Sequence, residues 1–221
     1  MPTICCAPGC GAQTTRYGNY CNTHKSRQRR HGAPDQLAIT EPMLRPFMRA
    51  VHRRREKNDD NLLWGNLDKR WLGIVDLARS IKASFEGGKA GYWFDFKAAD
   101  QVLSLADEVP PKDIVDTCLA MYLLHYAEPH RFKTDDAFRV QMVRRVRLLG
   151  DAYAERRWNP MTEKLTRAYR ELPPRATEVI ADWLVGILGG PGVHLAHLEK
   201  RDADRQQQEK IEFQQALQEM K

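Results

Sequence analysis

The chain has 221 residues and a formal net charge of +6, and 42% of its residues are hydrophobic and 29% charged. That length allows one substantial hydrophobic core and a small satellite module, and the composition excludes an intrinsically disordered protein. No run of about 18 apolar residues is apparent, so we expect a cytoplasmic protein without a membrane span.

The positive charge is concentrated at the N-terminal end of the chain. Residues 1–57 contain eleven Lys and Arg residues against three acidic residues, whereas the other 164 residues carry a net charge of −2. A basic segment of this kind favours an anionic partner, and we expect that partner to be nucleic acid, DNA rather than RNA.

Four of the five cysteines lie within the first 21 residues. Cys5, Cys10, Cys21 and His24 follow the spacing C-x4-C-x10-C-x2-H, which predicts one tetrahedral Zn²⁺ site. Four protein ligands leave no open position for water, so the predicted zinc is structural and not catalytic. Cys6 could replace Cys5 with C-x3-C spacing, and the sequence leaves this choice open.

Residues 5–34 also resemble the zinc-binding module at the start of many phage-encoded HNH endonucleases and other small phage proteins. In that family the pattern runs C-x4-C and then C-x2-H-x2-R-x-R-R-x-G-x-P, which Cys21 to Pro34 matches. The resemblance implies that Cys5, Cys10, Cys21 and His24 are the ligands, that Arg27, Arg29 and Arg30 lie on the following short helix, and that a phage or mobile element encodes the chain. The His, Asn and metal-binding residues of an HNH nuclease are not found after Pro34, so the resemblance favours a binding module.

A linker at residues 35–42 follows the zinc module (1–34) and precedes a helical domain predicted to span residues 43–192. Leu44, Phe47, Met48 and Val51 have the spacing of a helix with one buried stripe, and arginines occupy the other faces. The residues that we expect to contact nucleic acid are Lys25, Arg27, Arg29, Arg30, Arg45, Arg49, Arg53, Arg54 and Arg55.

Further helical patterns follow along the domain. They predict helices over about 61–85 and 95–108, a buried helix that stops at Pro129, a long helix over 138–153 and another over 165–172. No alternation long enough for a strand is present. Cys118 has the setting of an inert core residue, and Arg144, Arg145 and Arg147 either extend the nucleic-acid surface or form a solvated face.

The last helix of the domain is predicted to stop at Gly189-Gly190-Pro191-Gly192. Residues 193–221 then form a polar projecting helix with an apolar stripe at its end. The predicted fold is therefore mainly α: a multi-helix domain with an N-terminal zinc module and a projecting C-terminal helix.

The sequence predicts a zinc-containing nucleic-acid-binding factor, specifically a DNA-binding transcription regulator that acts with a protein partner such as RNA polymerase or another DNA-processing complex. No HExxH, GxSxG, P-loop or GxGxxG motif is present, so we assign no catalytic residue. Two alternatives stay open: a nuclease or recombination factor, and a protein-docking adaptor or inhibitor with a structural zinc. Homo-oligomerisation is also left open.

Overall fold

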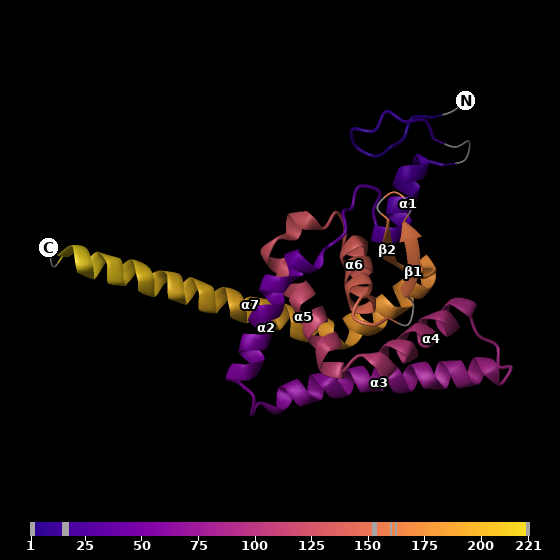
Figure 1. The fold of residues 1–221 in the computed structure, drawn as a ribbon. Coiled ribbons are helices and arrows are strands. Elements are labelled where there is room, and N and C mark those ends of the chain that lie inside the picture. The colour runs from indigo at the N-terminus through magenta and orange to yellow at the C-terminus, as the bar shows by residue number, and fades with distance from the viewer. Residues whose placement is uncertain (1–2, 15–17, 152–153, 160, 162, 220–221) are drawn as a thin grey trace.

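The computed structural model describes residues 3–14, 18–151, 154–159, 161 and 163–219. Within them the fold is mainly α, as predicted (Figure 1). The helices are α1 (Asn22–His31), α2 (Glu41–Lys57), α3 (Leu62–Glu86), α4 (Trp93–Glu108), α5 (Pro111–Ala127), the 3-10 turn η1 (Pro129–Arg131), α6 (Asp135–Arg147) and α7 (Pro174–Glu219). Two strands, β1 (Ala154–Asn159) and β2 (Lys164–Tyr169), complete the fold.

Helix α5 lies at the centre of the helical domain. Every residue from Ile114 to Leu124 is buried, and α5 packs against α2, α3, α6 and α7. It stops before Pro129, as predicted, because proline has no N–H to continue the ladder. Cys118 is fully buried here, and burial raises the pKa of its thiol, which confirms it as an inert core residue.

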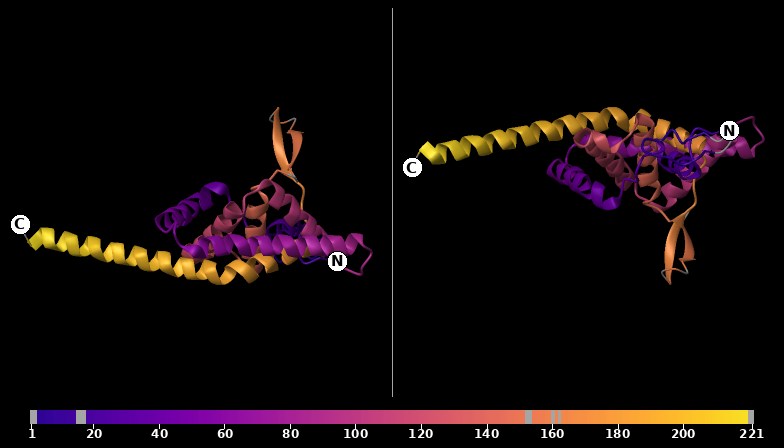
Figure 2. Two further views of the ribbon diagram at one scale, coloured as in Figure 1. Left: turned by 90° about the horizontal axis from the view of Figure 1, so that it is seen from below. Right: turned by 90° about the horizontal axis from the view of Figure 1, so that it is seen from above.

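An antiparallel hairpin replaces the helices predicted over the end of 138–153 and over 165–172. Helix α6 ends at Arg147, and β1 then pairs with β2 so that Ala154 lies opposite Tyr169. The hairpin stands away from the helical core in both views of Figure 2. A two-stranded ribbon that stands away from the core needs no alternation of apolar and polar residues, so this segment shows no strand pattern in its sequence.

Helix α7 continues through the predicted stop at residues 189–192. The glycines serve close packing here, since a Cβ on Gly192 would lie 2.3 Å from the Tyr122 ring on α5. Pro191 cannot donate to the carbonyl of Ile187, one turn earlier in the helix. Instead the Arg70 Nη1 donates to that carbonyl at 3.1 Å. The predicted helix stop at residues 189–192 is therefore wrong, because one continuous helix extends from Pro174 to Glu219.

The C-terminal half of α7 projects from the domain, as predicted (Figure 1). By length and composition, residues 174–216 could cross a membrane, whereas no such segment was expected from the sequence. Ile180, Leu184 and Leu188 from this stretch are buried in the core of the protein, and 39% of its most apolar window is buried.

Two buried glutamines fasten the segment between α1 and α2 to the domain. The Gln141 Oε1 accepts from the Ile39 N–H at 2.9 Å, and its Nε2 donates to the His31 carbonyl at 3.3 Å. Gln36 donates to the Arg131 carbonyl at 3.0 Å and accepts from the Lys133 N–H at 3.0 Å. These bonds hold the C-terminal end of α1 against α6.

Gly32 sets how closely α1 approaches α6. Its φ of +91° is in the left-handed region, and a Cβ at this position would lie 2.7 Å from the Cα of Ala137. Glycine is therefore required for both the turn and the close approach.

Candidate metal centre and basic surface

The N-terminal module consists of a tight turn that carries Cys5 and Cys10, the knuckle, and the first turn of α1. The Cys5 N–H donates to the Ala12 carbonyl at 2.9 Å, and the Cys10 N–H donates to the Ala7 carbonyl at 3.1 Å, which turns the chain between the first two cysteines. Cys21 occupies the N-cap position of α1, and His24 lies in its first turn. Residues three apart at the start of a helix lie on the same side of it, so the side chains of Cys21 and His24 both face the knuckle.

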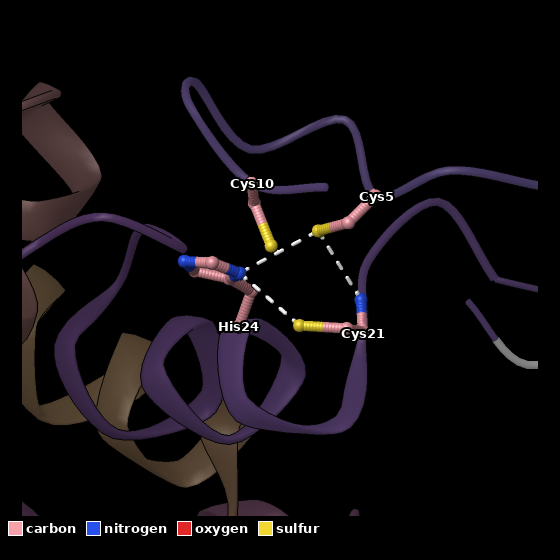
Figure 3. A group of neighbouring side chains, drawn as sticks. All are labelled: Cys5, Cys10, Cys21 and His24. Atoms are coloured by element: carbon pink, nitrogen blue, oxygen red, sulfur yellow. Dashed lines mark hydrogen bonds between the residues drawn. The ribbon is translucent and has the colours of Figure 1, made fainter. Parts of the chain in front are cut away.

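The ligand atoms of Cys5, Cys10, Cys21 and His24 all lie within 4.8 Å of one another (Figure 3). The His24 Nδ1 is 3.2 Å from the Cys21 Sγ and 3.5 Å from the Cys5 Sγ. No disulfide joins these cysteines. The structure thus confirms a Cys₃His cluster that could hold one metal ion.

The structure favours Cys5 over Cys6 as the first ligand. Cys5 is buried in the small core of the module with Cys21, whereas Cys6 is exposed and lies outside the cluster. Adjacent residues on an extended segment point to opposite sides, so Cys6 faces away when Cys5 faces inward.

The hydrogen bonds around Cys5 favour its thiolate. Burial raises the pKa of this thiol, but the N–H groups of Cys21 and Ala7 and the neighbouring thiols outweigh burial and lower the pKa to about 6. The Cys21 N–H donates to the Cys5 Sγ at 3.3 Å. A thiolate is the form that binds metal, so these hydrogen bonds suit Cys5 to the role of a ligand.

The basic residues predicted to bind nucleic acid divide into exposed and inward-facing groups. The exposed ones on the two helices are Arg27, Arg29, Arg30, Arg45, Arg49 and Arg53. Lys25 is half-buried. The set is carried by two helices with different neighbours, since α1 packs on α6 and α2 packs on α5.

Arg54 and Arg55 pack against the protein, which corrects their assignment as nucleic-acid contacts. Arg54 forms ion pairs with Glu199 and Asp202 on α7. Arg55 is buried and donates to Asp116 at 2.6 Å and to Asp68 at 3.1 Å, and its guanidinium lies 4.6 Å from the centre of the Trp64 ring. These two arginines therefore join helices, and their charges are neutralised.

The contact between α1 and α6 brings the two predicted basic clusters together. Arg29 and Arg30 from α1 and Arg144 and Arg147 from α6 line one cavity, whereas Arg145 is not among the residues that line it. Arg170 also lines it, although the sequence analysis did not select Arg170. A single arginine after β2 carries no sequence signal of its own, because only the tertiary contact places it beside the others.

Comparison of the chain with models of known protein families, with curated proteins and with solved structures finds no match. The Cys₃His cluster and the distribution of charge around it are therefore the features that bear on function.

Proposed function

We propose that the protein is a zinc-containing nucleic-acid-binding factor that acts as a phage or mobile-element DNA-binding transcription regulator. The observation that carries the proposal is the position of the Cys₃His cluster at the first turn of α1, the helix that bears Arg27, Arg29 and Arg30. A metal that joins Cys21 and His24 to the knuckle would fix the direction of this helix. Its exposed guanidinium groups would then face phosphates in a defined orientation.

Zinc is the ion that best suits this donor set. Three thiolates and one imidazole are soft to borderline ligands, and four of them fill a tetrahedral shell. The same thiols persist only in a reducing compartment, which is consistent with a cytoplasmic location. The zinc would stabilise the module, which has a very small core of its own.

Metal analysis of purified variants tests the zinc centre. We expect one zinc per chain in the wild type and in Cys6→Ser, because Cys6 is exposed outside the cluster. Cys5→Ser and Cys21→Ser should lose most of the bound zinc, because each removes one of four ligands. Equal zinc content in Cys5→Ser and Cys6→Ser would contradict the assignment of Cys5.

Fluorescence anisotropy with duplex DNA over a series of salt concentrations tests the basic helix. Replacing Arg27, Arg29 and Arg30 together with Ala should weaken binding and lower the slope of log K against log salt by up to about 3, since each phosphate contact contributes roughly 0.9. Arg79→Ala on α3 is the matched control, because Arg79 is exposed and pairs with Asp76. An unchanged slope in the triple variant would remove α1 from the interface.

A protein-docking role is the second candidate, and the exposed end of α7 favours it. Ile211 and Phe213 are exposed on the part of the helix that projects from the domain. Such a helix would suit a partner such as RNA polymerase or another DNA-processing complex. Copurification of one defined protein that is lost on deleting residues 206–221, with no DNA binding at low salt, would favour this role over the regulator.

A further inference from the structure

A cavity of about 340 Å³ lies where the end of α1 meets α6 and the segment that follows β2. Its charged lining residues are Arg29, Arg30, Arg144, Arg147, Arg170 and Glu171. Five guanidinium groups therefore surround one carboxylate. The remaining wall is mostly apolar and is contributed by residues such as Val140 and Val143.

Two of these arginines are oriented by protein partners. Arg147 donates through Nε to the buried Gln101 at 2.8 Å and through Nη2 to the Arg170 carbonyl at 2.7 Å. Arg30 pairs with Glu171 across the cavity. Both contacts hold guanidinium groups at the cavity wall before any ligand arrives, which reduces the entropy lost on binding.

Arg144 and Arg147 are the half-buried arginines of this group, and the guanidinium of Arg144 forms no hydrogen bond or ion pair with the residues that the structure describes. Burial and the neighbouring charge of Arg30 lower the pKa of Arg144, although Glu171 opposes the effect. A guanidinium placed beside other guanidinium groups and away from bulk water is in an unfavourable setting. An anion in the cavity would remove that cost.

We propose that this cavity binds a phosphate group. Guanidinium groups donate two parallel hydrogen bonds to phosphate oxygens, and several converging arginines compensate the two negative charges of a terminal phosphate. The pocket does not depend on DNA binding by the exposed face of α1, because it is formed by α6 and residues 170–172 as well as by the end of α1.

The adjoining cavity makes a nucleotide the best-fitting carrier of this phosphate. It measures about 340 Å³ and shares Arg147, Arg170, Glu171 and Leu172 with the first cavity, so the two are neighbours. Trp93 also lines this adjoining cavity, with the Lys97 Nζ 4.5 Å from the centre of the Trp93 ring. An aromatic ring beside an arginine pocket suits a base attached to the phosphate.

A different cavity beside α1, which shares Arg29 with the first, shows why charge balance matters. Lys25, Arg29 and Arg139 line it, but Asp136, Glu178 and Asp182 line it too, and Arg139 pairs with Asp182. Its positive charges are neutralised by the protein itself. We therefore place the phosphate site only in the cavity that contains Arg144.

Isothermal titration calorimetry of the zinc-loaded full chain with inorganic phosphate and with adenosine monophosphate tests the proposal. We expect adenosine monophosphate to bind, and Arg144→Gln to weaken its binding by at least about tenfold, since a charged hydrogen bond is lost. Glu171→Gln should tighten binding by a few fold, because it removes the carboxylate that competes for Arg30. Arg79→Gln is the control and should bind as the wild type does.

The outcomes separate this proposal from the proposed function. A short single-stranded oligonucleotide with a 5′-phosphate, titrated in parallel, shows whether the phosphate comes from a polynucleotide or from a free nucleotide. If duplex DNA binds through α1 but neither phosphate nor nucleotide binds, and Arg144→Gln equals Arg79→Gln, the pocket proposal is overturned and the regulator stands. If the nucleotide binds through Arg144 and duplex DNA does not bind, the pocket stands alone.

Discussion

His31 and His125 are held in their neutral forms by their surroundings. Burial lowers the pKa of His31, and the charges of Arg144, Arg30 and Arg27 lower it further. The Nδ1 of His31 lies 3.0 Å from the Gln141 Nε2, an N–H donor that bonds only to an unprotonated ring nitrogen. Burial also lowers the pKa of His125, whose ring stacks on Phe138 at 4.4 Å between centroids.

These two histidines predict a loss of stability on mild acidification. Each pKa is lower in the folded chain than the value of about 6.5 in the unfolded chain, so the unfolded chain binds protons first. The stability is fully present above about pH 6.5 and is lost as the pH falls through the pKa values of the folded chain. Urea unfolding at about pH 7 and about pH 5 measures it.

The double variant His31→Gln/His125→Gln isolates this effect from the metal ligands, whose protonation is common to both proteins. Its free energy of unfolding should depend less on pH than that of the wild type over the same interval. Parallel pH profiles for the two proteins would show that the histidines do not contribute.

At the scale of single residues, the sequence predicted the metal cluster but not which arginines are exposed and which pair with acidic residues of the protein. Cys21 and His24 lie on one helical turn, so local spacing alone brings their side chains together. Arg55 instead meets Asp116, a residue distant in the sequence, and a run of basic residues does not indicate which of them has such a partner. The choice of Cys5 over Cys6 likewise required the backbone path of the knuckle.

At the scale of the elements, a buried arginine and two aspartates join three helices. Arg55 on α2 pairs with Asp116 on α5 and with Asp68 on α3, and the side chain of Asp116 is completely buried. Removing one partner leaves the other charge buried without compensation. Arg55→Met should therefore lower the free energy of unfolding by roughly 3–5 kcal/mol in chemical denaturation.

The paired variant Arg55→Met/Asp116→Leu is the control for this prediction. It removes the two buried charges and leaves Asp68, which is partly exposed to water. It should therefore recover most of the lost stability, because apolar side chains of similar size replace the buried pair. A double variant as unstable as Arg55→Met would mean that lost packing, not the unpaired carboxylate, causes the effect.

The bond from Arg70 to the Ile187 carbonyl predicts a second coupling between helices. Arg70→Ala should destabilise the protein by roughly 0.5–1 kcal/mol, since it leaves that carbonyl without the donor that replaces the missing N–H of Pro191. In a Pro191→Ala background the helix supplies its own N–H, so the same change should have a smaller effect. A double-mutant cycle by thermal unfolding measures the difference, and strictly additive effects would contradict it.

The elements that the sequence predicted well are those whose buried stripe is continuous. Helix α2 buries Leu44 and Val51, as the helical spacing indicated. Helix α7 was predicted to end too early because Gly and Pro usually end helices. The close contact of Gly192 with Tyr122 shows that this glycine serves packing between α7 and α5 and does not end the helix. The hairpin β1–β2 was missed because a two-stranded ribbon away from the core does not need the alternation of apolar and polar residues that indicates a strand.

At the scale of the whole molecule, the buried hydrophobic side chains of the described residues form two separate cores. The large core involves α2 to α7, and the small one consists of Cys5, Ala7 and Cys21 with Cys10 and Tyr20 against them. The small core buries too little apolar surface to fold by itself. The module should depend on its metal, whereas the helical domain should not.

Chelation should therefore unfold the module and spare the domain. With a strong zinc chelator we expect only a small decrease in far-ultraviolet helical circular dichroism, because α1 has just 10 residues. The thermal transition of the domain should persist in the same sample. Loss of that transition would show that the two cores unfold as one unit, and an unchanged signal from the N-terminal segment would contradict a structural metal.

The fold class and the two ends of the molecule could be predicted from the sequence, because composition and helical periodicity are summed over many residues. The meeting of α1 with α6 could not, since it depends on Gly32, Gln36 and Gln141, which form specific contacts across the fold. That meeting creates the arginine cavity from clusters that are far apart in the sequence.

The projecting end of α7 gives the molecule an electrical polarity. Residues 201–221 contain four basic and five acidic residues, whereas residues 1–34 contain five basic and no acidic residues, and the N-terminal module and the end of α7 lie at opposite ends of the molecule (Figure 1). In the field of a polyanion such a body experiences a torque that turns its N-terminal end inward. The C-terminal part of α7 is then directed outward. At roughly 1.5 Å per residue, its free portion extends about 20 Å beyond the domain, which is within reach of a second macromolecule on the same polyanion.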